Sequence, residues 1–305
     1  MTELSNVVVN DSSNDYILSC CSTCDLSASH LSDIGVHCLP FHFNLDGVEY
    51  PDDLGASMPY DDFYKAMASG SSTSTSQVSV GDYIDFFTEL LSTGKDILHL
   101  AFSSGLSGSY NSAMQAVETV LEKFPDRKIY VVDSLAASSG YGLLVDKLAE
   151  LRASGMGIDE LHDWVEENKL RLHHWFFSTD LTFYVKGGRV SKVEGVIGGM
   201  LSICPLLHVS NEGKLVPIYK LRGKRRAIEK CVQMMVEHAD GGADYADKCY
   251  LSHSACIDDA NAVKSMIESA FPHTKGGVLI NSIGTTIGSH TGPGTTALFF
   301  WGDKR

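Results

Sequence analysis

Two short segments in the first half of the chain concentrate hydroxyl and glycine residues, and both could bind an anion. Residues 73–79 (TSTSQVS) hold five hydroxyl side chains and one amide. Residues 102–113 (FSSGLSGSYNSA) run from a predicted strand through two glycines into a predicted helix, with Ser103, Ser104 and Ser107 along the way. Free N–H groups at the start of a helix, together with serine hydroxyls, suit an oxyanion. Helix capping or a polar loop without any ligand is the alternative for both segments.

Two single residues in the second half could complete an anion site. Arg189 follows a Gly-Gly pair, which indicates a tight turn that presents a guanidinium. Arginine can hold a carboxylate through two parallel hydrogen bonds, although a solvated surface arginine is the common alternative. His290 lies in a Gly-x-His-x-Gly-Pro-Gly pattern, which predicts a rigid loop packed closely against another part of the protein. A lone histidine is more often structural than functional.

A basic segment stands out from an otherwise acidic chain. Residues 214–230 carry seven basic side chains and one acidic one, whereas the whole chain has a formal net charge of −14. Such a segment can simply be a solvated helix face. On this background it predicts a docking site for an acidic partner or a phosphorylated ligand. The candidate residues are Lys220, Arg222, Lys224, Arg225 and Arg226.

Three thiols lie within five residues near the start of the chain, and Cys21 and Cys24 have the Cys-x-x-Cys spacing. A structural zinc ion needs four ligands, and no second Cys-x-x-Cys or close histidine pair completes the set. We therefore predict neither a metal site nor a redox pair here. Five further cysteines are scattered singly among apolar residues, which is typical of small buried side chains.

Size and charge exclude several classes of protein. With 305 residues, 44% hydrophobic and 20% charged, the chain is long enough for one large domain or two ordinary ones. Its negative charge disfavours nucleic acid and anionic membrane surfaces. The sequence shows no signal-peptide pattern and no apolar run of about 18 residues. We expect a cytoplasmic protein without stable membrane insertion.

The first half alternates predicted strands with predicted helices, which favours a parallel sheet covered by helices on both faces. The second half is less regular and predicts a second α/β domain, joined to the first near residues 152–175. The expected domains are 1–165 and 166–305. The strands are predicted at 16–20, 36–47, 96–102, 128–134, 174–184, 248–254 and 276–284. The helices are predicted at 58–70, 79–94, 108–124, 138–151, 158–170, 225–238 and 258–271.

Common catalytic signatures are missing from the sequence. It has no phosphate-binding P-loop, no dinucleotide-binding glycine turn, no His-Glu-x-x-His and no Gly-x-Ser-x-Gly. The sequence therefore offers no means of binding ATP by itself and no recognisable nucleophile–base pair.

Taken in order, the singled-out segments resemble the DegV family of bacterial fatty-acid-binding proteins, which includes the acyl-carrying subunit of fatty acid kinase. Five motifs carry the resemblance across nearly the whole chain: TSQVS at 75–79, SSGLSGS at 103–109, GGR at 187–189, KLRG at 220–223 and HTGPG at 290–294. Two positions depart from the family pattern. Cys21 stands where an aspartate is usual, which puts the role of that loop in doubt, and Val78 replaces the usual proline.

The resemblance implies an α/β, two-domain DegV-like architecture with a ligand tunnel between the domains. A long-chain fatty acid would bury its tail there, and each buried methylene contributes about 0.8 kcal/mol. Family resemblance implies that Thr75, Ser76, Ser103 and Ser104 bind the carboxylate, with Arg189 and His290 close by. Apolar residues of the segment 196–207 would line the tail pocket. We expect no cofactor other than the bound fatty acid, and no metal.

The family's kinase subunit would supply ATP and magnesium, and the bound carboxylate would be phosphorylated to acyl-phosphate. The basic segment at 220–226 would hold the phosphate or dock the kinase, and the chain would not be catalytic alone. Two alternatives remain open at this point. One is a serine-dependent acyl hydrolase that uses Ser104 or Ser107 with His290, and the other is a lipid sensor without a kinase partner.

Overall fold

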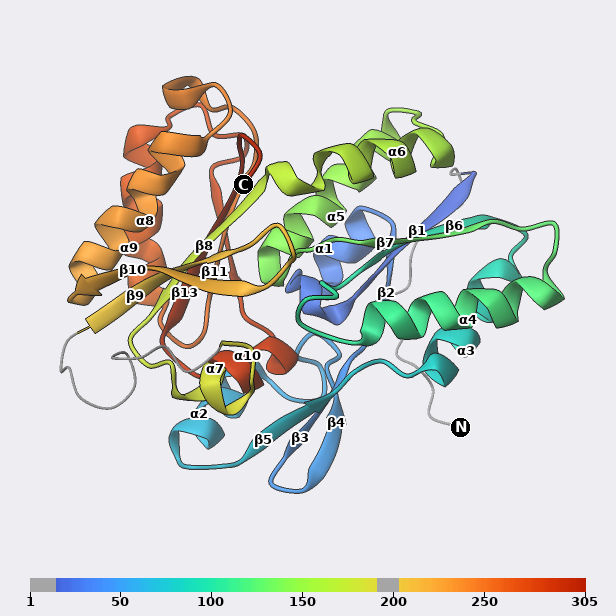
Figure 1. Cartoon of the computed structure of the whole chain (residues 1–305), viewed down its shortest axis with the longest axis horizontal. Helices are drawn as coiled ribbons and strands as arrows, with labels where there is room; N and C mark the ends of the chain where they lie inside the picture. Colours follow the sequence, from blue (N-terminus) through green and yellow to red (C-terminus); the bar gives the residue numbers. More distant parts are fainter. Residues whose placement is uncertain (1–14, 191–202) are drawn as a thin grey trace.

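A parallel four-stranded sheet forms from the first half of the chain, as the alternating pattern predicts (Figure 1). The computed structural model describes residues 15–190 and 203–305. Neighbouring strands of this sheet pair in parallel throughout. Their order is β2 (Val36–Leu39), β1 (Tyr16–Cys21), β6 (Asp96–Ala101) and β7 (Ile129–Asp133).

Helices cover both faces of this sheet. On one face lie α3 (Val80–Leu91) and α4 (Ser109–Lys123), and on the other lie α5 (Ser138–Ala153) and α6 (Ile158–Asn168) (Figure 1). A short 3-10 turn, η1 (Ser22–Cys24), and helix α1 (Ala28–Asp33) connect β1 to β2. The apolar sequence of α5 has a direct structural reason. This helix is buried on nearly all sides because it contacts η1 and α6 as well as the second sheet.

The second half builds a six-stranded mixed sheet. All neighbouring strands are antiparallel except β11 and β12. Helices α8 (Lys224–His238) and α9 (Ile257–Ala270) cover one face, while α5 contacts the opposite face (Figure 1). Two 3-10 turns, η2 (Lys169–Arg171) and η3 (Gly242–Asp244), precede β8 and β11. The strand order is β10 (Leu215–Arg222), β9 (Ile203–Val209), β8 (Leu172–Ser178), β13 (Thr295–Trp301), β11 (Cys249–His253) and β12 (Val278–Ser282).

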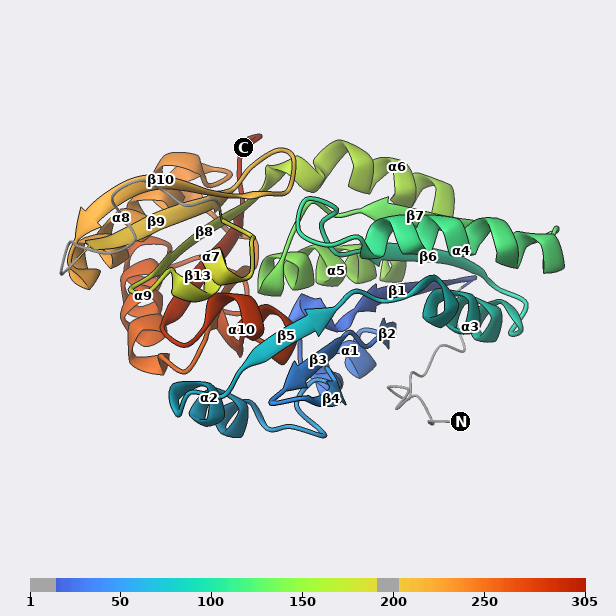
Figure 2. The ribbon, with the colours of Figure 1, turned by 60° about the horizontal axis from the view of Figure 1, so that its bottom comes forward.

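A small antiparallel sheet joins the two halves (Figure 2). Its strands, in spatial order, are β4 (Val48–Pro51), β3 (His42–Leu45) and β5 (Thr73–Ser76). Helix α2 (Tyr60–Ala68) lies between β4 and β5 in the sequence. Helix α10 (Thr285–Thr291), from the far end of the sequence, packs on β3, β5, α2 and α7 (Thr182–Lys186). The small sheet therefore brings hydroxyl residues of the first half against a helix of the second half.

The structure corrects several predictions about local structure. Residues 73–76, predicted as a polar loop or helix cap, form β5 because they pair with β3, although Ser79 does cap α3. The strand predicted to reach residue 184 ends at Ser178, and the Asp180 side chain accepts a hydrogen bond from Thr182 N, which begins α7. His290 belongs to a helix rather than a loop.

The Met114 side chain on α4 is 42% exposed. The face that packs inward instead carries small residues, because Ser109 and Ser112 hydrogen-bond to Tyr83 and Gln77.

Within the described residues, no helix has both the length and the apolar character that a bilayer crossing requires.

Candidate ligand-binding site

A cavity of about 240 Å³ lies where the two halves meet. Its lining comes from β5, the loop after β6, the start of α5, the six-stranded sheet, the turn after α7, and α10. Carbon predominates over most of the wall. The apolar lining residues are Phe41, Phe102, Leu106, Phe176, Val209, Leu215, Ile283, Ile287, Ala297 and Phe299.

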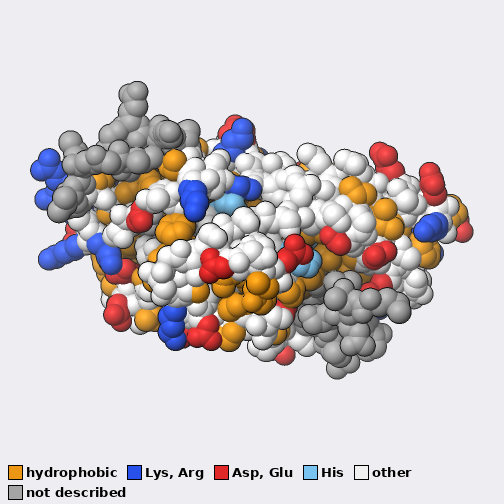
Figure 3. Space-filling view, turned by 90° about the horizontal axis from the view of Figure 1, so that it is seen from below, with side chains coloured by type: hydrophobic (Ala, Val, Ile, Leu, Met, Phe, Trp, Pro, Cys, Tyr) orange, Lys and Arg blue, Asp and Glu red, His pale blue; other side chains and the backbone are white. Residues whose placement is uncertain are grey.

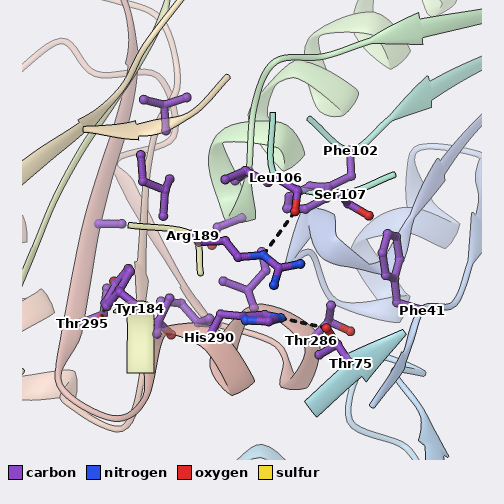
Figure 4. Close-up of a pocket in the computed structure, with 18 of the residues that line it drawn as sticks. Phe41, Thr75, Phe102, Leu106, Ser107, Tyr184, Arg189, Thr286, His290 and Thr295 are labelled. Carbon is purple, nitrogen blue, oxygen red and sulfur yellow. Dashed lines mark hydrogen bonds between the residues drawn. The ribbon is translucent and has the colours of Figure 1, made fainter. Parts of the chain in front are cut away.

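Arg189 and His290 lie together in the part of the cavity between Tyr184 and Phe41, with Thr75 and Ser107 beside them (Figure 4). Thr75, Ser107 and Ser76, which also lines the cavity, contribute hydroxyl groups to this polar part, and Arg189 and His290 contribute nitrogen atoms. A hydrogen bond of 2.7 Å joins Thr75 Oγ1 and His290 Nε2. The arrangement of an apolar wall with one polar part suits an amphipathic molecule that has a single polar head.

Arg189 brings a positive charge to this polar part. Its Nε donates to Leu106 O at 3.3 Å (Figure 4). Its Nη1 donates to Gly187 O at 2.5 Å. Within residues 15–190 and 203–305, no carboxylate forms an ion pair with it, and its hydrogen-bond acceptors are backbone carbonyl groups. Burial lowers the pKa of the guanidinium, which is the direction expected when a charge lacks compensation. An anionic group in the cavity would supply that compensation.

His290 is neutral in this setting. Burial lowers its pKa to about 4, and the nearby charge of Arg189 acts in the same direction. A neutral imidazole can donate or accept one hydrogen bond at each nitrogen according to its tautomer. Its Nδ1 is buried without a partner among the described residues, so the ring retains hydrogen-bonding capacity.

The Gly-Gly turn before Arg189 has a steric reason. A Cβ atom at Gly187 would overlap with Nδ1 of His290. Gly187 therefore allows the turn and α10 to approach each other closely enough to place Arg189 beside His290. Gly188 adopts a φ of 72°, the left-handed conformation that favours glycine.

We expect Gly187→Ala to weaken ligand binding severalfold, because the added methyl must displace the His290 ring. Overpacking of this kind typically costs about 1–3 kcal/mol. Equilibrium titration with a fluorescent fatty acid measures the affinity, and thermal unfolding measures stability. Gly81→Ala in α3 is the control, because its Cβ would meet only ordinary contacts. Equal affinities for the two variants would contradict the steric role.

The structure brings only part of the predicted carboxylate site to the cavity. Thr75, Ser76, Arg189 and His290 line it, whereas Ser103 and Ser104 do not. The Ser103 hydroxyl is buried and donates to Gly213 O at 2.8 Å, so it ties this loop to the β9–β10 turn. Ser104 is exposed, and its N–H donates to Asp133 Oδ1. Ser107, three residues after Ser104, is the serine of this loop that lines the cavity.

Several lining residues were missed by the sequence analysis. Ser138, Tyr184, Thr286 and Thr295 face the cavity, and the Tyr184 hydroxyl hydrogen-bonds to Thr295 Oγ1 at 2.9 Å. Ser138 and Tyr184 lie in a predicted helix and a predicted strand, whereas Thr286 and Thr295 lie outside every predicted element. The Tyr184 position had been assigned to a strand, so its orientation could not be predicted.

Two buried carboxylates hold the start of α10. Asp25 accepts hydrogen bonds from Ser138 Oγ at 2.5 Å and from Gly284 N at 2.9 Å. Asp52 accepts one from Thr286 N at 3.3 Å. Burial raises the pKa of both carboxyl groups. Asp25 thus connects the loop after β1, in which Cys21 replaces the usual aspartate of the family pattern, to the start of α5 and to the residue before α10.

The cysteine cluster near the chain start is buried. Cys20 and Cys24 approach to 3.9 Å between sulfur atoms, and Cys21 Sγ lies 3.3 Å from the Tyr83 hydroxyl. Burial raises the pKa of Cys21 to about 12, so this thiol is protonated at neutral pH. The scattered cysteines are buried as predicted, apart from Cys256, which is partly exposed.

The five basic residues proposed for docking are all exposed, on β10 and the first turn of α8. Two of them form ion pairs, Lys224 with Asp259 at 2.8 Å and Arg225 with Glu229 at 2.9 Å. Basic side chains project at the end of the molecule where β10 meets α8 (Figure 3). None of the five lines the cavity.

The tail-pocket segment proposed at 196–207 falls largely outside the described residues. Its described part, 203–207, lies in β9 and does not line the cavity, whereas Val209 of the same strand does.

The fold has two large sheets with a cavity between them, and this cavity is mostly apolar but contains the guanidinium of Arg189. These features define a class of small-molecule-binding protein. A sequence model of the DegV family, described as an uncharacterised protein family, matches residues 21–303. The chain belongs to the DegV family.

Relatives with known sequences or structures agree with this assignment. A DegV domain-containing protein of Clostridium perfringens is 38% identical over 284 residues, which cover 93% of this chain and 96% of the relative. A DegV lipid-binding protein of Thermotoga maritima has a similar structure, with a TM-score of 0.82 and 27% identity over 95% of this chain and 99% of that one. A fatty-acid-binding DegV family protein of Thermus thermophilus gives a TM-score of 0.82 at 27% identity, covering 94% and 99% of the two chains.

Proposed function

We propose that the protein binds a long-chain fatty acid, with its tail in the apolar cavity and its carboxylate in the polar part formed by Thr75, Ser76, Arg189 and His290. The observation that carries the proposal is the half-buried guanidinium of Arg189, which faces a mostly apolar cavity and donates hydrogen bonds to backbone carbonyl groups. Lipid and fatty-acid binding by the two Thermotoga and Thermus relatives supports the same ligand class.

The hydrophobic effect would provide most of the affinity. Each methylene that enters the cavity contributes about 0.8 kcal/mol before the costs of ordering are subtracted. A carboxylate that enters with the tail loses its hydration, and this is costly unless donors replace the water. Arg189 and the hydroxyls of Thr75, Ser76 and Ser107 are the donors within reach of the polar part.

We further propose that the protein presents the bound acid to a separate ATP-binding kinase subunit and is not catalytic alone. The exposed basic residues of β10 and α8 suit an acidic partner surface. The hydrolase alternative has less support. The described partner of His290 Nε2 is Thr75 rather than a serine, and Ser104 lies outside the cavity lining.

Organic extraction of the purified protein followed by mass spectrometry tests the binding proposal. We expect co-purified long-chain fatty acid at close to one molecule per chain. Absence of fatty acid, together with failure to bind added fatty acid, would contradict the proposal.

The partner proposal needs its own test. Mixing the loaded protein with a cognate ATP-binding subunit, ATP and magnesium should yield acyl-phosphate. We expect the double substitution of Arg222 and Arg226 by glutamate to reduce the rate at least tenfold without changing fatty-acid affinity. Lys65→Glu, which alters a 76% exposed lysine on α2, is the control. Turnover of an acyl ester by the protein alone would favour the hydrolase instead.

A further inference from the structure

Three potential metal ligands converge near the end of the described chain, on the face of the six-stranded sheet opposite the cavity. They come from three separate elements: His173 from β8, His238 from the last position of α8, and Asp303 from the segment after β13. One donor atom from each lies within 4.8 Å of the other two. Consecutive residues of a strand point to opposite faces, so His173 faces this cluster while His174 lines the cavity.

Two of the three donor-atom separations are compatible with tetrahedral coordination, although they also match ordinary hydrogen bonds. Asp303 Oδ1 lies 3.2 Å from His173 Nε2 and 3.1 Å from His238 Nδ1. In a tetrahedral zinc site with bonds of about 2.0–2.1 Å, neighbouring donor atoms are separated by about 3.3 Å. Two of the three separations therefore need almost no adjustment to admit an ion.

The backbone holds these three residues in place before any ion binds. Asp303 N donates to His238 O at 3.1 Å, and Gly302 N donates to Arg171 O at 2.8 Å. A Cβ atom at Gly302 would collide with His238 O and crowd the His173 ring. Glycine at this position is what lets the final segment approach both histidines.

Accessibility and charge are also compatible with a cation. The His173 side chain is 2% exposed, that of His238 is 32% exposed and that of Asp303 is 65% exposed, so the cluster is anchored inside and open to solvent on one side. An ion could enter from that side, and water could complete its coordination. His238 ends α8, where the negative end of the helix dipole favours positive charge.

We propose that His173, His238 and Asp303 bind one divalent transition-metal ion such as zinc, which fastens the end of the chain to β8 and α8 (Figure 1). Two imidazoles and one carboxylate favour zinc, cobalt or nickel over magnesium or calcium, which prefer oxygen ligands. The proposal is independent of fatty-acid binding. The competing explanation is a purely hydrogen-bonded cluster, in which the Asp303 carboxylate accepts from both rings.

Asp303→Asn separates the two explanations. The asparagine keeps an oxygen that can accept the histidine N–H groups, but it loses the negative charge that a metal ligand needs. His238→Ala removes a second, partly exposed ligand. His162→Ala is the matched control, because His162 is 29% exposed and also lies 3.2 Å from a single carboxylate, that of Asp163.

The test is titration of the chelator-stripped full chain with zinc against a chromophoric chelator, and with cobalt monitored by visible absorption. We expect one ion per chain in the wild type and in His162→Ala, with nitrogen and oxygen ligation. We expect at least a tenfold loss of zinc affinity in Asp303→Asn and His238→Ala, and a zinc-dependent rise in melting temperature only where the site is intact. Equal zinc affinity in wild type and Asp303→Asn, or a cobalt spectrum dominated by thiolate ligation, would overturn the proposal.

Discussion

Replacing Arg189 by methionine is expected to lower the affinity for a long-chain fatty acid by about 10-fold to 150-fold. Methionine keeps much of the apolar length of the side chain but removes the charge and all its donors. A hydrogen bond to a charged group contributes about 1.5–3 kcal/mol, which corresponds to that range of affinity. Displacement of a fluorescent fatty acid from the delipidated protein measures the change.

Two controls show whether the loss arises at the carboxylate. Lys186→Met removes a neighbouring exposed cation on α7 and should leave the affinity within about twofold, because surface charges contribute little. A long-chain alcohol with the same tail should bind the wild type and Arg189→Met with similar affinity. If the alcohol lost as much affinity as the acid, Arg189 would be shaping the cavity rather than binding the headgroup.

Strongly patterned elements of this fold could be predicted from sequence. The continuous apolar runs of β6 and β7 and the apolar helix α5 are found within a few residues of their predicted positions. These strands and this helix are buried on more than one side, so nearly all of their side chains must be apolar. Such continuous apolar segments are easy to recognise in a sequence. The parallel sheet and a second set of strands and helices follow from those elements.

Short polar elements could not be predicted in the same way. β5 reads Thr-Ser-Thr-Ser, which gives no apolar alternation, and it becomes a strand because β3 supplies its hydrogen-bonding partner. α10 spans seven residues that include a glycine, and it is held as a helix by packing on β3, β5, α2 and α7. In both elements tertiary contacts outweigh local preference.

The same limit applies to the candidate site. Four of the six residues predicted to hold a carboxylate line the cavity, because motif order placed them near the meeting point of the two halves. Asp25 was missed because its partner Gly284 is 259 positions away in the sequence. The metal-ligand set was missed for a similar reason, since His173 and Asp303 are 130 positions apart. No spacing rule connects residues so distant.

The buried carboxyl group of Asp25 should make stability fall as pH rises from about 4. Asp25 is 3% exposed, and burial is the main cause of its raised pKa, although a hydrogen bond from Ser138 opposes it and the nearby Asp52 charge adds to it. Below the unfolded-state pKa of about 3.9, the group is protonated in both states and costs nothing. Above this pKa, the unfolded chain releases the proton while the folded chain retains it. Ionisation therefore stabilises the unfolded state, and the free energy of unfolding falls.

The expected slope is about 1.4 kcal/mol per pH unit, continuing until the folded-state pKa is reached. Asp25→Asn removes the titration but keeps an oxygen for Gly284 N and an amide for Ser138, so the variant should not show this part of the slope. We therefore expect its free energy of unfolding, measured by urea denaturation at several pH values, to rise relative to the wild type as pH increases above about 4.

Asp146→Asn provides a control of opposite sign. Burial opposes ionisation of Asp146, but hydrogen bonds from His30 and Lys248 outweigh it and lower the pKa of this carboxyl group. Its stabilising contribution is present above the unfolded-state pKa and is lost as pH falls through the folded-state pKa. Asp146→Asn should therefore lose stability relative to the wild type as pH rises toward about 4 and change little above it, whereas Asp25→Asn should gain stability as pH rises above about 4. If the stability of both variants, relative to the wild type, changed in the same direction as pH rose, the Asp25 carboxyl group would be ionised in the folded protein. The start of α10 would then be held by a negative charge rather than by a protonated carboxyl group.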